Sequence, residues 1–492
     1  MKRMKKIMAL MLAAIMMMAM SVTAFAAEGA TGIRTLTVNA NGGQDLTGQT
    51  INLYKLFDVT ESKSGETTNY AYTVNTASGY KNALVSVLTE AGKTVTVGSK
   101  DEEFAKAVFE IGAKDSKEVQ SFANKFTTYA LTNGLAATKT SGKITGENKT
   151  SFEFTGLDAG YYLVYVTGGK EIQSSLVTVD ETTNKVNLKT EAPSINKTAD
   201  KTTVNIGNVV TYTVTGSIPD TTGYDKYQYI IHDELSAGLD FVNDAIGTAL
   251  GEGATTVNVT VAFTDNTLTV AGTKPTTATL DTANNREMSL DLSEWVRDNQ
   301  ANKGKEFTVI YYAKVNKDAV VTEKNNAQLE YGNKPGETTK TTPSEAKTPT
   351  YPLDILKKKA GTGTGEGALE KLAGAKFKLY KDRVDEANVI KISETAVKGN
   401  YVVNPTSATT EFESVANIDG VDYNLRVNGL AEGTYYLVET KAPDGFNKLT
   451  APVEIKITKS TDTDVNNWTI SKAGTVETDK IIDIENSTGS LL

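Results

Sequence analysis

The sequence of 492 residues contains no cysteine and only one histidine. Without cysteine the chain has neither disulfide bonds nor thiol chemistry, and a single histidine cannot build a histidine-rich metal site. Positive charge is also in the minority, because 51 Lys and Arg residues face 60 Asp and Glu residues, for a net charge of −9. Nucleic-acid affinity depends on Lys and Arg contacts with phosphates, so we expect no nucleic-acid partner.

Long apolar runs are confined to the N-terminus. Residues 1–26 combine four basic residues near the start, an apolar run from Ile7 to Met20 and the small-residue motif Ala24-Phe25-Ala26. This pattern is typical of a secretory signal peptide, since the apolar run is too short for a membrane span. We therefore expect a secreted protein that resists the extracellular environment without disulfides.

Two segments of the chain are repeated. Residues 46–55 read like residues 372–381, and residues 156–164 read like residues 429–438. The two halves lie further apart in the first copy, so the first copy carries an insertion. Apolar residues at helical spacing predict that residues 82–133 form this insertion.

Elsewhere the apolar residues alternate with a period of two, in short runs bounded by Gly, Asn, Asp or Pro, such as residues 209–214 and 453–457. This pattern predicts the strands of all-β sandwiches. The length favours about three domains. We predict an all-β chain of three tandem Ig-like β-sandwich domains over residues 27–189, 190–348 and 349–492, the first with the helical insertion.

Two lysines fall in phase with the buried face of a predicted first strand. Lys197 does so in the middle domain and Lys357 in the third, although lysine is almost never buried unpaired. Each predicted last strand supplies an asparagine on the buried face, Asn486 in the third domain and Asn325 in the middle one. A shift of one residue would exchange Asn325 for its neighbour Asn326.

A buried lysine beside a buried asparagine and a carboxyl group is able to react. Burial favours the neutral amine and the protonated carboxyl. The amine then attacks the amide carbon while the carboxyl shuttles protons, and ammonia leaves. The candidate carboxyl groups are Asp233 in the middle domain and Glu439 in the third, and the product is a side-chain amide cross-link.

The motifs around these residues resemble those of one family. Residues 436–446 are similar to the E-box of Gram-positive pilins, and residues 372–380 resemble the strand that opens their collagen-adhesin B-type domains. Residues 233–239, together with residues 325–331, look like the isopeptide-forming middle domain of major fimbrial subunits. The chain is thus similar to sortase-assembled backbone pilins of the three-domain type.

The resemblance implies a collagen-adhesin A/B fold and two self-formed isopeptide bonds. One would join Lys197 to Asn325 with Asp233 assisting, and the other would join Lys357 to Asn486 with Glu439 assisting. It also implies a pilin-specific sortase and identical subunits as partners, in a head-to-tail fibre anchored to the cell wall. Apart from this single-turnover cross-linking we expect no enzymatic activity and no cofactor.

The first domain lacks the reactive set. Its repeat places Tyr165 where Glu439 stands in the third domain, and no lysine occurs between Lys6 and Lys55 to serve its first strand. We therefore predict no cross-link in the first domain.

By the resemblance, polymerisation needs an acceptor lysine between the first and middle domains. Lys189 occupies that place and is our choice, with Lys185 in reserve, although the tyrosine-proline pair of the family motif is missing. A sorting signal is expected after Asn486, and we expect that the given sequence ends just before it.

Two other classes of function compete with this prediction. An adhesin would use the β domains as a stalk and the helical insertion 82–133 to bind host surface ligands. An extracellular hydrolase lacks support, because no carboxylate pair lies in a recognisable catalytic motif. The segment from Asp462 to Asp464 is too short for a calcium site, so we expect no bound metal.

Overall fold

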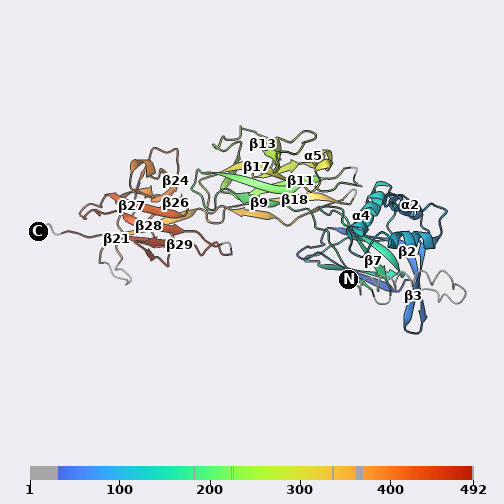
Figure 1. The fold of residues 1–492 in the computed structure, drawn as a ribbon. Coiled ribbons are helices and arrows are strands. Elements are labelled where there is room, and N and C mark those ends of the chain that lie inside the picture. The colour runs from blue at the N-terminus through green and yellow to red at the C-terminus, as the bar shows by residue number, and fades with distance from the viewer. Residues whose placement is uncertain are drawn as a thin grey trace.

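The computed structural model describes residues 32–180, 183–222, 224, 226–334, 337–361, 369–461 and 463–489. The predicted signal peptide, residues 1–26, and Asp462 lie outside the described residues. The molecule is elongated, with three units following one another in chain order and the described ends of the chain in the two outer units (Figure 1). Each unit is built from β-sheets, so the predicted all-β class and tandem arrangement are confirmed.

The first unit contains two sheets with strand orders β5-β1-β8 and β3-β2-β6-β7, and β4 pairs with β2. Its first strand, β1, runs antiparallel to β5 and parallel to β8, and its apolar side chains Leu36 and Val38 are fully buried between the sheets. The strands are β1 (Arg34–Asn39), β2 (Thr50–Ser64), β3 (Thr67–Val74), β4 (Lys139–Lys143), β5 (Ser151–Leu157), β6 (Gly160–Val166), β7 (Ser175–Val179) and β8 (Lys185–Asn187).

Three helices lie between β3 and β4, where the insertion was predicted. They are α2 (Tyr80–Glu90), α3 (Asp101–Phe109) and α4 (Lys117–Thr132). The last begins at Ser116, whose hydroxyl accepts a hydrogen bond from the Val119 amide and so satisfies one of the unpaired amides of the first turn. Apolar residues at helical spacing form a second core against the sheet that contains β2.

The middle unit is a sandwich of two sheets. One has the order β12-β17-β10-β9, with β14 on β17, and the other has the order β13-β15-β16-β11-β18-β19, with β20 on β18. Its elements are β9 (Asn196–Ala199), β10 (Val209–Ser217), β11 (Tyr229–Leu235), β12 (Leu239–Val242), β13 (Thr256–Asn258), β14 (Thr260–Phe263), β15 (Thr277–Leu280), β16 (Glu287–Asp291), α5 (Ser293–Asp298), η1 (Gln300–Asn302), β17 (Glu306–Val315), β18 (Lys324–Lys334), β19 (Glu337–Lys340) and β20 (Ser344–Lys347).

The third unit has sheets of order β23-β24-β26-β21-β31 and β25-β22-β27-β28-β29-β30. Its first and last strands, β21 and β31, are parallel neighbours, as β1 and β8 are in the first unit. Its elements are β21 (Tyr351–Lys359), β22 (Lys376–Lys381), η2 (Glu386–Asn388), β23 (Ile392–Glu394), β24 (Asn400–Val403), β25 (Glu411–Glu413), β26 (Leu425–Leu430), β27 (Gly433–Lys441), β28 (Val453–Thr458), β29 (Thr469–Lys472), β30 (Thr475–Val476) and β31 (Ile481–Asn486).

Hydrogen bonds join the middle and third units. The Ile206 amide donates to the Gly429 carbonyl over 3.0 Å, and the Ala431 amide donates to Asn205 Oδ1 over 2.6 Å. The buried apolar residues of both units form one continuous cluster. Within the described ranges no helix is both long and apolar enough to cross a membrane.

Candidate functional site

In the middle unit, Lys197, Asp233 and Tyr311 come together between the two sheets. Lys197 lies on β9 and Tyr311 on β17 of one sheet, whereas Asp233 lies on β11 of the other. The Lys197 ammonium donates to Asp233 Oδ2 and to the Tyr311 hydroxyl, and the same hydroxyl donates to Asp233 Oδ2. Alternation along β11 places Asp233 on the inward face, so its side chain is completely shielded from solvent.

Burial changes the proton affinity of both charged groups. It lowers the pKa of Lys197 to about 8, although the adjacent Asp233 opposes that change. Burial also raises the pKa of the Asp233 carboxyl, against the opposing effects of Lys197 and Tyr311. Both changes favour the pair of a neutral amine and a protonated acid, which is the pair that the cross-linking chemistry needs.

Asn325 belongs to the same buried space. It lies on β18 opposite Leu235 of β11, and it is fully buried, whereas Asn326 is only partly buried. Its side chain lies near enough to Asp233 to help lower the pKa of that carboxyl group, although the two groups do not meet hydrogen-bond geometry. Neither amide atom of Asn325 makes a hydrogen bond to the described residues. The inward face of β18 therefore carries Asn325 rather than Asn326.

In the third unit, Lys357 and Asn486 lie on neighbouring parallel strands. Lys357 of β21 is opposite Ile484 of β31, and Lys359 is opposite Asn486. Lys357 is fully buried, and its ammonium donates to the Ile484 carbonyl over 3.3 Å. Burial lowers its pKa to about 8, although the charge of Glu439 opposes the shift.

Glu439 reaches Asn486 from the opposite sheet. It lies on β27 and is buried, and its Oε2 accepts from Asn486 Nδ2 over 3.0 Å and from the Leu449 amide over 2.7 Å. Asn486 Nδ2 also donates to the Asn447 carbonyl over 2.8 Å. Glu439 Oε1 and Asn486 Oδ1 have no hydrogen-bond partner among the described residues. The amide and the carboxyl are thus held against each other, with one oxygen of each left for a reaction.

Among the described residues of the first unit, the corresponding space holds no such set. Its first strand, β1, carries no lysine, and Tyr165 on β6 is buried. Lys55 lies on β2 and forms ion pairs with Asp58 at 2.5 Å and with Asp158 at 3.4 Å. These contacts satisfy the charge of Lys55 at the edge of the core and leave it without a buried amide partner.

Lys189 and Lys185 both lie at the end of the first unit. Lys185 is an exposed residue of β8. Lys189 follows β8, and its ammonium donates to Gln120 Oε1 of α4 over 3.2 Å and lies 3.8 Å from Asp115 Oδ1. Its side chain is 44% exposed, so a partner can reach the amine.

Sequence reasoning missed Tyr311. No role was predicted for any tyrosine hydroxyl in the middle domain. The signal that could have found it is phase, because Phe307, Val309 and Tyr311 alternate on the inward face that also receives Lys197.

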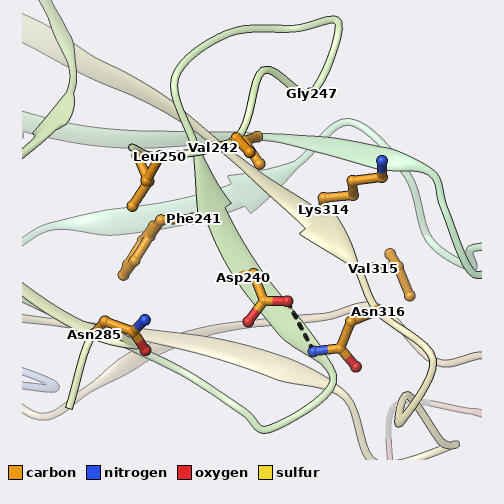
Figure 2. A pocket seen from close by; sticks show the side chains of 10 residues that line it. Asp240, Phe241, Val242, Gly247, Leu250, Asn285, Lys314, Val315 and Asn316 are labelled. Atoms are coloured by element: carbon orange, nitrogen blue, oxygen red, sulfur yellow. Dashed lines mark hydrogen bonds between the residues drawn. The ribbon is translucent and has the colours of Figure 1, made fainter. Parts of the chain in front are cut away.

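The middle unit also contains a separate cavity of about 330 Å³, shown in Figure 2. Apolar side chains such as Phe241 and Leu250 line it together with Asp240 and Asn316. The Asp240 carboxylate accepts from Asn316 Nδ2 over 3.1 Å and from Arg286 Nη2 over 2.9 Å. Because Asp240 is already paired within the protein, the cavity offers no reactive set comparable to that around Lys197.

Part of the third unit matches a known family of domains. Residues 362–472 match the family model of the SpaA prealbumin-like fold domain. No curated protein matches the chain.

Several solved structures are similar to the chain. The full-length major pilin SpaD of Corynebacterium diphtheriae is 17% identical, with 95% of this chain and 100% of that one covered at a TM-score of 0.42. The major pilin SpaA of the same organism is 17% identical, with 92% of this chain and 100% of that one covered at a TM-score of 0.43. The major pilin BcpA of Bacillus cereus is 16% identical, with 93% of this chain and 99% of that one covered at a TM-score of 0.34. These similarities concern the fold. The matched residues 362–472 include Glu439 and are similar to the SpaA prealbumin-like fold domain.

Proposed function

We propose that this chain is the structural backbone subunit of a covalent cell-surface pilus, stabilised by two intramolecular Lys–Asn isopeptide bonds. The observation that carries the proposal is the set of buried Lys357, Asn486 and Glu439. A solvent-shielded lysine with a depressed pKa, next to a buried amide that contacts a carboxyl group, has no ordinary structural purpose.

The reaction needs no external reagent. The neutral Lys357 amine attacks the Asn486 amide carbon, a new C–N bond forms, and the old C–N bond breaks as ammonia leaves. Glu439 accepts the proton that the amine loses and returns it to the departing amide nitrogen. In the middle unit Lys197, Asn325 and Asp233 take the same roles. The ammonia consists of the –NH2 of the asparagine amide and one proton of the lysine amine, so atoms and charges balance.

Polymerisation is the second part of the proposal. A pilin-specific sortase would join the C-terminal region of one subunit to the Lys189 amine of the next, giving a head-to-tail fibre on the cell surface. Two features support this. Lys189 is exposed. It belongs to the first unit, and the first and third units are the two outer units of the molecule (Figure 1).

Intact mass spectrometry of the chain from residue 27 tests the cross-links. We expect a mass lower than that of the sequence by two ammonia molecules. Asp233→Ala and Glu439→Ala should each prevent one of these two losses. The matched controls are Asp240→Ala, a carboxyl of the middle unit outside the Lys197 cluster, and Glu485→Ala on the outward face of β31, which should keep both losses. A wild-type mass equal to that of the sequence would contradict the proposal.

A further inference from the structure

The Tyr311 hydroxyl lies at the centre of the buried cluster in the middle unit. It accepts from the Lys197 ammonium and donates to Asp233 Oδ2. The same Oδ2 also accepts directly from Lys197. Two hydrogen bonds therefore end on Asp233 Oδ2, a third joins Lys197 to the Tyr311 hydroxyl, and all three side chains are buried.

The other side of that carboxyl group is left open. Asp233 Oδ1, Asn325 Oδ1 and Asn325 Nδ2 have no hydrogen-bond partner within the described part of the chain. A buried carboxyl oxygen and a buried amide without partners are costly, because each has lost its water without a replacement. The unpartnered oxygen of Asp233 and the unpartnered amide of Asn325 occur in one space, where the reaction takes place.

A second tyrosine in the cluster shows what is specific to Tyr311. The rings of Tyr212 and Tyr311 lie at nearly equal distances from the Lys197 nitrogen, 4.6 Å and 4.7 Å to the ring centres. Both are fully buried. The Tyr212 hydroxyl, however, makes no hydrogen bond to any described residue. The two residues thus share burial and ring contact with the amine, and only Tyr311 contributes a hydroxyl.

We propose that Tyr311 is a catalytic residue of cross-link formation in the middle unit, because its hydroxyl holds Asp233 Oδ2 and the Lys197 amine together and leaves Asp233 Oδ1 to Asn325. This inference rests on the proposed function. The described residues of the third unit offer no equivalent, because the groups that bond Glu439 Oε2 there are an amide side chain and a backbone amide.

The balance of the step is the same as in the third unit. The Lys197 amine passes a proton to Asp233 Oδ2, directly or through the hydroxyl, which gives its own proton to the carboxyl and takes one from the amine. As the Lys197 nitrogen bonds to the Asn325 amide carbon, Asp233 returns a proton to Asn325 Nδ2, and the old C–N bond breaks. The Lys197–Asn325 amide forms, ammonia leaves, and Tyr311 ends as the neutral phenol with which it began.

The experiment follows the rate of this cross-link in newly made protein. The full chain is synthesised in a cell-free system and quenched in acid at intervals, and the cross-linked peptides are quantified by mass spectrometry. Tyr311→Phe should slow the Lys197–Asn325 bond about tenfold or more, the effect of losing a hydrogen bond to a charged group. Tyr212→Phe should leave the rate unchanged. The rate at which the Lys357–Asn486 bond forms in the same molecules is the internal reference.

The pH dependence separates chemistry from packing. The titratable groups around the reaction are Lys197, Asp233, Tyr212 and Tyr311, and the charges of Glu323 and Asp200 also act on Tyr212. Removing the phenol donor destabilises the Asp233 carboxylate, so the alkaline limb of the rate profile should move to higher pH in Tyr311→Phe. A packing role for Tyr311 would have two signs: Tyr311→Phe slows the reaction without this shift, and it lowers the melting temperature of the unreactive variant Asn325→Ala. That combined result would overturn the inference.

The two proposals fail in different ways. If Asp233→Ala abolishes the Lys197–Asn325 bond but Tyr311→Phe forms it at the wild-type rate, the inference about Tyr311 is wrong and the proposed function stands. If wild-type protein forms no Lys197–Asn325 bond, the proposed function itself is wrong for the middle unit.

Discussion

Lys197 and Lys357 are both buried, but different groups compensate the lost hydration of their ammonium groups. Lys197 contacts a carboxylate, a phenol and two aromatic faces. Lys357 has one backbone carbonyl as its hydrogen-bond acceptor and the more distant charge of Glu439. Burial dominates in each, since the pKa of both lysines falls to about 8. Either lysine is therefore a far better nucleophile near neutral pH than an exposed one.

A pH-dependent stability should appear when Lys357 is kept unreacted. In Asn486→Ala the amine has no amide to react with, and its folded pKa of about 8 lies below the ordinary value of 10.5. The unfolded chain then binds more protons between these two values, so stability should rise from about pH 8 to about pH 10.5, by up to a few kcal/mol.

Urea unfolding of Asn486→Ala at several pH values measures this rise. The control is Asn486→Ala with Lys357→Met, which removes the titrating amine and keeps an unbranched side chain. The prediction is wrong if both variants show the same dependence on pH.

At the scale of elements, strand pairing decides what each cross-link would connect. In the third unit Lys357 and Asn486 lie on adjacent strands, β21 and β31, which already share a sheet. In the middle unit β9 and β18 belong to opposite sheets, so the bond would fasten the two layers of the sandwich. The bond in the third unit would resist shear between its first and last strands, and the bond in the middle unit would resist separation of its two sheets.

The end of β26 also sets the contact between the middle and third units. Gly429 has a φ of 102°, and a Cβ at this position would lie 2.4 Å from the Ile206 side chain of the middle unit. Gly429→Ala should therefore combine backbone strain with a clash, at about 2–4 kcal/mol. Differential scanning calorimetry should show a clear drop in the melting temperature of the third unit.

Gly420→Ala is the matched control for this prediction. Its φ of 81° imposes similar backbone strain, but a Cβ there meets no atom within 4 Å. We expect a loss of only about 1–2 kcal/mol. Equal losses in the two variants would show that the contact with Ile206 does not constrain Gly429.

For the whole molecule, the uneven placement of the reactive sets predicts an uneven response to tension. A covalent bond between strands would stop the chain beyond it from extending, and we predict no such bond in the first unit. Under pulling in a single-molecule experiment, we expect the first unit to extend while the middle and third units stay folded.

The double variant Asp233→Ala with Glu439→Ala should remove this difference, so that all three units extend. The variant with Asp240→Ala should behave like the wild type. Full extension of the middle or third unit in wild-type protein would contradict the predicted mechanical role of the cross-links.

Polymer formation depends on which lysine of the first unit accepts the next subunit. With a pilin-specific sortase and subunits that carry a sorting signal, Lys189→Ala should abolish the ladder of covalent oligomers on a denaturing gel. Lys185→Ala, four residues earlier on β8, should leave the ladder intact because Lys189 remains. The reverse result would move the acceptor to Lys185.

Local patterns of apolar residues in the sequence predicted much of the fold. Period-two alternation placed Lys197 and Asn486 inward, because successive side chains of a strand point to opposite faces. Helical spacing located α2 to α4. The partners of a strand are different, because pairing is a long-range choice: nothing in residues 196–199 shows that β9 faces a sheet containing β11 and β18.

The sequence by itself determined which residue types are available: no cysteine, an inward lysine and asparagine in each of the last two domains, and no such lysine in the first. Those features depend on composition and phase, which are local. Only the tertiary structure decided that the Tyr311 hydroxyl lies between Lys197 and Asp233, because three strands from two sheets must pack before their side chains share one buried space.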